Sequence, residues 1–368
     1  MMNVPFVDLK IQYQSLKPEI DAAVQSVIEN TAFIGGKTVE SFEQAYAAKF
    51  GVKHCVSCAN GTDAIYIALK ALGIGPGDEV ITVANSWIST SETITQAGAR
   101  PVFVDIDEYF HIDPARIAEK ITPRTKAVIP VHLYGQPAAI EMILRIGQAH
   151  SLPVIEDCAQ SHFATLNGRA TGTFGLAGTF SFYPGKNLGA YGDAGALITD
   201  DDSFAHHARL FANHGSLKKH IHEIEGINSR LDGIQAAVLS VKLKHIDSWN
   251  RARHAHGLAY NAQLADVPEV KCPRLRENAF HIFHVYSLRA FRRDALADHL
   301  KSRGISTGIH YPTALPFMPA YEHLGYRPAD FPAAYECQGE ILSLPMYPEL
   351  TDEMIGHVVR SIKEFYAK

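Results

Sequence analysis

The feature that most constrains the fold is an alternation between residues 61 and 213, where short apolar runs rich in β-branched residues are separated by longer amphipathic segments. This pattern is typical of βαβ units, in which helices cover both faces of a mostly parallel sheet. We expect strands at 79–83, 101–105, 126–131, 153–157, 179–183 and 194–199. We expect helices at 63–72, 140–150 and 202–213. The predicted fold class is therefore α/β.

The pattern changes after about residue 235. Apolar residues recur near helical spacing in residues 235–259, which predicts a long connecting helix. Beyond it we expect a strand at 284–289, a loop at 309–319 and helices at 293–303 and from 351 to the end. The sequence thus predicts a large domain at residues 1–240 and a smaller C-terminal α/β domain at residues 241–368.

Charge and composition argue against several classes of partner. The chain has 34 basic and 39 acidic side chains, with no block of Lys and Arg, so we expect neither nucleic acid nor an anionic membrane surface as a partner. No apolar run approaches the roughly 18 residues of a membrane span, and the first ten residues do not resemble a secretion signal. Five cysteines fit reduced thiols better than a disulfide framework, which favours a cytoplasmic protein.

Three motifs could carry chemistry, and the first is residues 59–64, Ala-Asn-Gly-Thr-Asp-Ala, which lead into an amphipathic stretch. A chain that opens into a helix presents free N–H groups and the positive end of the helix dipole, which suit a phosphate. The same residues also form an ordinary turn and cap, so this motif alone leaves both interpretations open.

The second motif places Glu156 and Asp157 at the carboxyl end of an apolar strand, followed by Gln160. Ligands bind at that edge of open α/β sheets, and a carboxylate there needs a cation or solvent. Asp157 could hold the protonated nitrogen of a pyridine ring, and Gln160 could donate to a ring oxygen. The alternative is that Asp157 only caps a helix.

The third motif is the most informative, because Lys186 follows an apolar strand in a loop with glycines at 185, 189, 192 and 195. A glycine-rich backbone lets the amine approach a bound ring closely. A partly desolvated lysine has the lowered pKa that Schiff-base chemistry needs. The alternative is a lysine in a solvated surface loop.

Other patterns do not predict a site. Cys55 and Cys58 have the spacing of a redox or metal pair, but no second pair completes a zinc site, so we expect a structural role. The 19 histidines include no His-Glu-x-x-His motif, and we expect no metal site. The glycines at 73, 75 and 77 precede a strand instead of following one, so they do not form a dinucleotide fingerprint.

Taken together and in order, the motifs at 61–64, 156–160, 181–186 and 226–232 resemble those of the DegT-like nucleotide-sugar aminotransferases. The resemblance extends to the opening residues 4–9 and to residues 343–346. These relatives are pyridoxal-phosphate enzymes of fold type I. The resemblance therefore implies a large domain with a mostly parallel seven-stranded sheet between helices and a smaller C-terminal domain.

The resemblance also assigns roles to single residues. Lys186 is similar to the lysine that binds pyridoxal 5'-phosphate covalently, and Asp157 to the partner of the ring nitrogen. Further positions would contact the ring hydroxyl, the phosphate, the ring face and the sugar; these are Gln160 (hydroxyl), Gly61, Thr62 and Ser181 (phosphate), Trp87 (ring face), and His310 and Tyr311 (sugar). Asn228 resembles an asparagine that reaches the phosphate from a neighbouring subunit, which implies a homodimer with shared sites.

The implied activity is transfer of an amino group, usually from glutamate through pyridoxamine phosphate, to a dTDP- or UDP-linked keto-hexose for a surface glycan such as O-antigen of lipopolysaccharide. One alternative is a sugar dehydratase, but such relatives carry His where this chain has Lys186. A second is a non-catalytic, pyridoxal-phosphate-binding regulatory protein, for which this chain lacks an additional DNA-binding module. A third is a nicotinamide oxidoreductase, which the missing glycine fingerprint disfavours. The sequence does not specify the sugar, the nucleotide or the aminated carbon.

Overall fold

The computed structural model describes residues 2–218 and 220–367. Its strands are β1 His54–Cys58, β2 Glu79–Val83, β3 Arg100–Val104, β4 Thr125–Ile129, β5 Ile155–Asp157, β6 Thr165–Leu166, β7 Arg169–Ala170, β8 Ala177–Ser181, β9 Gly195–Thr199, β10 Val270–Lys271, β11 Ala279–Phe280, β12 Tyr286–Ala290 and β13 Ile341–Leu344. Its α-helices are α1 Leu9–Glu29, α2 Gly36–Phe50, α3 Gly61–Ala71, α4 Ser89–Gln96, α5 Ile140–Ala149, α6 Asp202–Ala212, α7 Gly233–Leu243, α8 Ile246–Leu264, α9 Arg293–Ser302, α10 Pro332–Glu340 and α11 Asp352–Tyr366.

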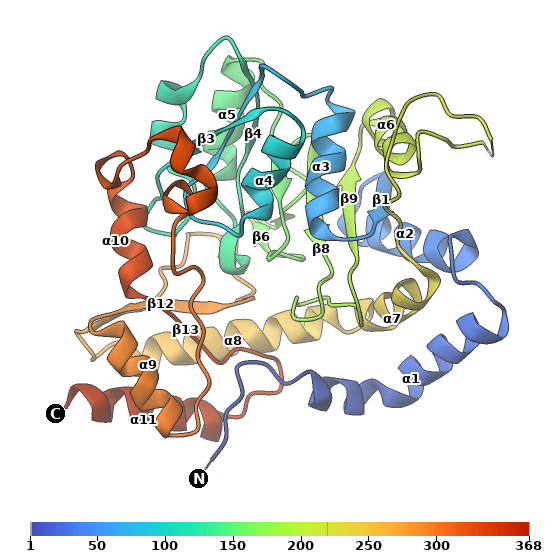
Figure 1. Cartoon of the computed structure of the whole chain (residues 1–368). Coiled ribbons are helices and arrows are strands. Elements are labelled where there is room, and N and C mark those ends of the chain that lie inside the picture. Colours follow the sequence, from blue (N-terminus) through green and yellow to red (C-terminus); the bar gives the residue numbers. More distant parts are fainter. Residues whose placement is uncertain (1, 219, 368) are drawn as a thin grey trace.

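The central strands form two neighbouring sheets (Figure 1). One has the order β1-β9-β8-β5 and the other the order β3-β2-β4. Two isolated parallel bridges, Val128 to Val154 and Val131 to Asp157, join the chain around β4 to the chain around β5. The α/β class and the mostly parallel pairing are therefore as expected, since only β9 runs antiparallel to its neighbours. The expected single sheet of seven strands is instead divided into ladders of four and three.

Alternation of side chains along these strands explains why helices lie on both faces. In β9, Leu197 packs in the same cluster as α3 and α6, whereas its neighbours Ala196 and Ile198 pack in the cluster of α2 and α7. The same change of face occurs in β1 between Cys55 and Val56. Because successive residues of a strand point to opposite faces, an all-apolar strand needs helices on both sides.

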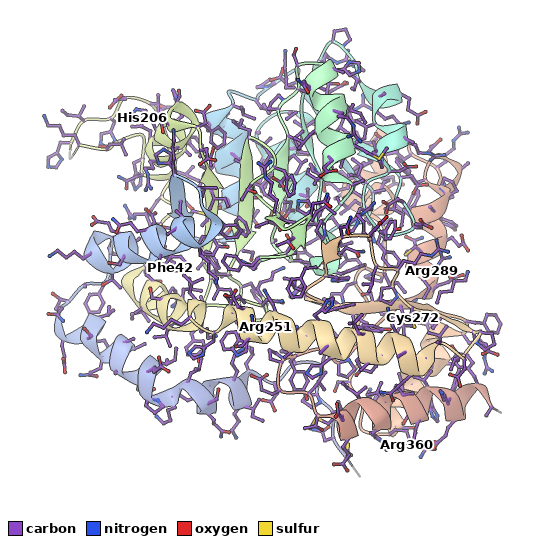
Figure 2. The ribbon with its side chains drawn as sticks, turned by 180° about the vertical axis from the view of Figure 1, so that it is seen from behind. Phe42, His206, Arg251, Cys272, Arg289 and Arg360 are labelled. Carbon is purple, nitrogen blue, oxygen red and sulfur yellow. The ribbon has the colours of Figure 1, made fainter. Side chains whose placement is uncertain are left out.

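The C-terminal part is built around the sheet β10-β12-β13 and the helices α9 and α11. Helix α8, which carries Arg251, runs across the molecule below the central strands and reaches the side where Cys272 lies (Figure 2). Val4, near the N-terminus, pairs with Ile305 and packs in this C-terminal cluster. The domain boundary at residue 240 falls near the end of α7, and it remains a prediction.

Two sequence-based expectations need correction. The long helix expected at 235–259 is two helices, because the chain breaks at Lys244 and His245 between α7 and α8. The strand expected at 284–289 begins only at Tyr286, which leaves His284 in the preceding connection. The other expected strands lie within two residues of their observed bounds at each end. Among the described residues, no helix combines the length and apolar character needed to cross a membrane.

Candidate active site

The carboxyl ends of several central strands open into a cavity of about 580 Å³. Asp157 ends β5, Ser181 ends β8, and Trp87 follows β2, so the topology itself gathers these side chains. The cavity brings together nine of the ten residues that the sequence singled out: Gly61, Thr62, Trp87, Asp157, Gln160, Ser181, Lys186, His310 and Tyr311.

One end of the cavity is the N-terminus of α3. Asn60 caps this helix by accepting a hydrogen bond from the backbone N–H of Asp63 at 2.8 Å. Within the described chain, the backbone N–H groups of Gly61 and Thr62 have no hydrogen-bond partner. A Cβ on Gly61 would lie 2.5 Å from the Cβ of Ser181, so only glycine lets α3 approach β8 this closely. Free N–H groups at a helix start, beside the Ser181 hydroxyl, make an anion site.

Asp157 lies deeper in the cavity and is only 4% exposed. Its carboxylate accepts hydrogen bonds from the hydroxyl of Thr90 at 2.8 Å and from the backbone N–H of Ala159 at 3.1 Å. Burial raises the pKa of Asp157, and these two donors and the nearby Lys186 oppose the rise. The carboxylate is thus held in one orientation in a place where a cationic partner would stabilise its charge.

Lys186 lies in the loop after β8 and reaches the same cavity. Its backbone N–H donates to the carbonyl of Tyr183 at 2.8 Å, which closes the turn that carries it. Burial lowers the pKa of Lys186 to about 8, against the opposing effect of Asp157. At neutral pH the side chain therefore has a much larger fraction of free amine than an ordinary lysine, which is what a nucleophilic amine requires.

Gln160 and two aromatic side chains form another wall of the cavity. The Gln160 carbonyl oxygen accepts from the backbone N–H of Tyr134 at 2.7 Å, and its amide nitrogen donates to the hydroxyl of Tyr311 at 3.1 Å. Trp87 lies near Tyr311, with 5.7 Å between ring centroids, and is 58% exposed. The orientation of the Gln160 amide is thereby fixed, and Trp87 leaves an open aromatic face.

His310 closes the cavity from the C-terminal part. Its ring stacks on Phe6, with 5.5 Å between centroids, and its Nδ1 lies 2.9 Å from the hydroxyl oxygen of Ser343. Burial lowers the pKa of His310 to about 4, and the charge of Lys186 lowers it further. His310 is therefore neutral at physiological pH and is positioned by Phe6, near the N-terminus, and by Ser343 of β13.

Asn228 is the one predicted residue that does not reach this cavity. It is exposed, and its backbone pairs with Asn213 after α6, beside a loop that projects from the molecule (Figure 1). The next residue, Ser229, donates its hydroxyl to Asp63 of α3 at 2.5 Å. Within one chain, Asn228 therefore contributes nothing to the cavity walls.

Glu156, the second acid of its motif, has a structural role. Its carboxylate accepts hydrogen bonds from the backbone N–H groups of Gly172, Phe174 and Gly175 at 2.7 to 2.8 Å. His132 donates to it through Nε2 at 2.8 Å, because Nδ1 accepts from the N–H of Ala138. His132 and Glu156 lie close enough to Cys158 to suggest a metal site. However, the protein already occupies both ring nitrogens and both carboxylate oxygens.

Sequence reasoning missed some of the side chains that support the site. Thr90 contacts Asp157, and Ser89 lies 2.7 Å from the hydroxyl of Thr62. Both begin α4, in which Ser91 and Thr93 are also buried. The run of hydroxyl residues at the start of α4 could have indicated this support from the sequence, because buried hydroxyl groups need hydrogen-bond partners. His284, another lining residue, gave no sequence signal of its own.

These residues fit pyridoxal phosphate by the chemistry of their groups. The start of α3 and Ser181 suit the phosphate, Asp157 suits a protonated ring nitrogen, and Lys186 suits the aldehyde carbon. Gly61, Thr62 and Ser181 all line the cavity, and the absence of a side chain at Gly61 lets the start of α3 lie against Ser181. Fold and site thus define an α/β protein with a lysine-containing pocket suited to a phosphorylated aldehyde cofactor.

The comparisons with known proteins identify the family. Residues 14–363 match the DegT/DnrJ/EryC1/StrS aminotransferase family, and the chain belongs to it. It is 48% identical to the "pleiotropic regulatory protein" of Geobacillus stearothermophilus, over 99% of each chain. It is 40% identical to the dTDP-3-amino-3,4,6-trideoxy-α-D-glucose transaminase of Streptomyces venezuelae, over 99% of this chain and 96% of the relative.

Solved structures of relatives have the same fold as this chain. The chain superposes on S. venezuelae DesV in complex with a ketimine intermediate with a TM-score of 0.98, at 40% identity and full coverage of both chains. It superposes on Bacillus subtilis NtdA with bound cofactor PMP with a TM-score of 0.91, at 30% identity over all of this chain and 86% of that one. The chain is a nucleotide-sugar aminotransferase, and its relatives imply pyridoxal phosphate as the cofactor.

Proposed function

We propose that the protein transfers an amino group from glutamate to a dTDP- or UDP-linked keto-hexose, for a surface glycan such as O-antigen. The observation that carries the proposal is the cavity in which Lys186, Asp157 and the start of α3 converge. The dTDP-sugar named for the S. venezuelae transaminase supports the substrate class.

Each side chain has a distinct task in this proposal. When bound, pyridoxal phosphate supplies an electron sink that lets an amino group pass from donor to acceptor. Asp157 keeps the ring nitrogen protonated, Gln160 donates to the ring hydroxyl, and Trp87 covers one ring face. The N–H groups of Gly61 and Thr62, with Ser181, hold the phosphate. Lys186 binds the cofactor and moves a proton at the reacting carbon.

The substrate side of the cavity is formed by His310 and Tyr311. Neutral His310 offers a hydrogen bond to a sugar hydroxyl without adding charge, because its low pKa keeps the ring unprotonated. Tyr311 also lines the cavity, and its hydroxyl accepts a hydrogen bond from the amide nitrogen of Gln160 at 3.1 Å, which holds it beside a group assigned to the cofactor. We infer that these two residues orient the keto carbon toward Lys186.

We further infer that the working form is a homodimer with shared sites in the cytoplasm. Two exposed aromatic side chains, Trp87 and Tyr183, line the cavity and are 58% and 59% exposed. Such a patch favours a protein partner. Asn228 lies away from the cavity of its own chain, as expected if it completes the site of a second copy.

The name of the G. stearothermophilus relative raises a regulatory role as the second candidate. A regulatory protein would need the cofactor pocket, but it would not need a side chain that transfers a proton within the pocket. Lys186, with a pKa lowered to about 8, is such a carrier and therefore favours catalysis.

A substrate panel tests the proposed function. The purified protein with pyridoxal phosphate and glutamate is incubated with 3-keto and 4-keto dTDP- and UDP-hexoses, and products are identified by mass and NMR. We expect one sugar to gain an amino group while glutamate becomes 2-oxoglutarate. No amination of any keto sugar, with glutamate or another amino acid as donor, would contradict the proposal.

A further inference from the structure

His162 is a fully buried histidine to which the chemistry above gives no role. It lies in the connection that follows β5. Its ring packs against the rings of Phe180 and Phe182, with 5.2 Å and 5.4 Å between centroids. Its backbone carbonyl accepts a hydrogen bond from the side-chain nitrogen of Asn250 in α8 at 2.9 Å. Backbone and ring of His162 are therefore both held in place beside the end of β8.

Both ring nitrogens of His162 have a partner. Nε2 lies 2.9 Å from the carbonyl oxygen of Ser181, and Nδ1 lies 2.9 Å from the hydroxyl oxygen of Tyr46 in α2. Since a carbonyl can only accept, the proton of the ring is on Nε2, and Nδ1 accepts from Tyr46. Burial lowers the pKa of His162 to about 3, although the bond to Ser181 opposes this effect. The ring is thus a neutral donor aimed at Ser181.

This hydrogen bond takes the place of a missing strand. The parallel pairing of β5 with β8 ends where Asp157 lies opposite Thr179, so no residue of β5 lies opposite Ser181. The N–H of Phe182 donates to Ala194 on the other side of β8 at 2.7 Å. Because neighbouring residues of a strand direct their backbone groups to opposite sides, the Ser181 carbonyl points away from that side. His162 supplies the donor that this carbonyl needs.

The side chain of Ser181 is the one assigned to the phosphate. Its hydroxyl oxygen accepts from the backbone N–H of Tyr183 at 3.3 Å, and no described residue accepts its proton. That proton is therefore available for an anion. Ser181 also lies so close to Gly61 that a Cβ there would be 2.5 Å from its own Cβ. A rotation of Ser181 would thus change both its contact with α3 and the direction of its hydroxyl.

We propose that His162 is a positioning residue for the phosphate end of the cavity, because it holds the carbonyl of Ser181 and thereby the direction of the Ser181 hydroxyl. This inference rests on the proposed binding of phosphate by Ser181 and the start of α3. Without the donor, the carbonyl turns to another partner, and Ser181 must move back before it binds phosphate. The population of the competent arrangement falls, and the affinity for phosphate falls with it.

The test compares two ligands of the cofactor-free protein, pyridoxal phosphate and pyridoxal, which has the same ring and aldehyde but no phosphate. Absorbance titration gives both dissociation constants, and their ratio measures the contribution of the phosphate. A general loss of structure weakens both ligands, whereas a misplaced Ser181 weakens only the binding of pyridoxal phosphate.

Three variants separate the bond to Ser181 from the rest of the cluster. His162→Leu removes the donor, whereas His162→Gln keeps an amide donor near the position of Nε2. Tyr46→Phe is the matched control, because it removes a buried hydrogen bond to the same ring but leaves the bond to Ser181.

We expect the preference for pyridoxal phosphate over pyridoxal to fall about tenfold in His162→Leu, because a buried carbonyl has lost its donor. The affinity for pyridoxal should stay within about twofold of the wild type. His162→Gln and Tyr46→Phe are expected to keep the preference within about twofold, since each retains a donor for the Ser181 carbonyl.

The outcomes separate this inference from the proposed function. If the wild-type protein binds pyridoxal as tightly as pyridoxal phosphate, the phosphate site itself is wrong. If the wild type prefers pyridoxal phosphate and His162→Leu has the same preference, only the role of His162 is wrong. An equal loss of preference in Tyr46→Phe and His162→Leu would reduce His162 to a structural residue and overturn the proposal.

A measurement on the wild-type protein covers the case in which His162→Leu does not fold. In cofactor-free protein with ¹⁵N-labelled histidine, the ring-nitrogen shifts of His162 report its tautomer, and the signal is assigned by its absence in His162→Gln. We expect a neutral ring with the proton on Nε2, and a larger shift of Nε2 on adding pyridoxal phosphate than on adding pyridoxal. A proton on Nδ1, or an equal response to both ligands, would overturn the proposal.

Discussion

Neighbouring carboxylates of β5 have different environments because a strand directs successive side chains to opposite faces. Glu156 points into backbone N–H groups and is fully occupied by them, whereas Asp157 points into the cavity with only two donors. Of the two carboxylates, only Asp157 therefore has acceptor positions free to bind a cation. Its burial makes the charge costly until that cation arrives.

Asp157→Asn tests this role. We expect the variant to bind pyridoxal phosphate but to lose at least about tenfold in kcat, since a bond to a charged partner contributes about 1.5–3 kcal/mol. Thr90→Val should cost less, because the N–H of Ala159 still orients the carboxylate. Asp247→Asn, at the exposed start of α8, is the control. A wild-type kcat and absorption spectrum in Asp157→Asn would reduce Asp157 to a structural residue.

Some residues of the site could be predicted from the sequence and others could not. Lys186, Asp157 and Gly61 belong to local motifs, so the sequence predicted that they would lie at one site, and they do line one cavity. Thr90 lies 67 positions from Asp157, and His284 lies 97 positions from Asn187. Contacts over such separations depend on how elements pack, which a local pattern does not contain.

Among the elements, α3 lies directly against β8, and the proposed phosphate site depends on this contact. The contact depends on Gly61, where any side chain would meet Ser181. Helix α3 must stay close to β8 for its first N–H groups and the Ser181 hydroxyl to face one anion.

Gly61→Ala tests that arrangement. We expect the dissociation constant for pyridoxal phosphate to rise at least about tenfold, because the added methyl group displaces the start of α3 and misaligns its N–H groups. Gly339→Ala in α10 is the matched control, since an added Cβ there meets nothing within 4 Å. Fluorescence titration with the cofactor gives both constants. Equal affinity in Gly61→Ala and the wild type would place the phosphate elsewhere.

Helix α7 supports the lysine loop from the other side through Lys242, which is 1% exposed. Its ammonium donates to the carbonyl of Gly189 at 2.7 Å and lies 4.3 Å from the ring centroid of Tyr191. Burial lowers the pKa of Lys242 to about 8, from the ordinary lysine value of 10.5. Below pH 8 both folded and unfolded states carry this proton, whereas above pH 8 the folded state loses it first.

The free energy of unfolding should therefore depend on pH through Lys242. Between pH 8 and 10.5, the unfolded state binds more protons at this lysine, so its contribution to stability grows as pH rises. We expect the free energy of unfolding of the wild type, minus that of Lys242→Met, to rise by at most about 1.4 kcal/mol per pH unit between pH 8 and 10.5. Urea unfolding of both proteins, at one protein concentration and several pH values, measures the difference. A difference that is independent of pH would show that Lys242 keeps an ordinary pKa.

Element boundaries were less predictable than element types. The predicted strand at 79–83 is β2 itself, but the apolar run at 179–183 extends two residues beyond β8. The break between α7 and α8 has no proline or glycine, and buried apolar residues continue on both sides of it, as Leu243 and Ile246 do. Periodicity reports which residues are buried, and it does not report where a helix axis changes direction.

At the scale of the whole molecule, the central question is whether one chain contains a complete site. Nine of the ten predicted site residues line the cavity of a single chain, and Asn228 does not. An asparagine can donate to a phosphate without changing the charge of the site. In the proposed dimer, two-fold symmetry would let each Asn228 complete the site of the other chain.

A complementation experiment tests the shared site. Lys186→Ala and Asn228→Asp should each be inactive, the second because a negative charge faces the phosphate. After chain exchange, a mixed dimer would have one doubly altered site and one intact site, so activity should return to about half of the wild-type value per mixed dimer. A mixture that stays inactive after proven exchange would place both residues in the same site of one chain.

The proposed role of Lys186 is tested by locating the lysine that binds the cofactor. The protein is loaded with pyridoxal phosphate, reduced with borohydride to make the carbon–nitrogen bond permanent, digested and mapped by mass spectrometry. We expect the added mass to lie on Lys186 and Lys186→Arg to take up none. Labelling of another lysine, such as the similarly buried Lys242, or equal labelling of Lys186→Arg, would contradict this role.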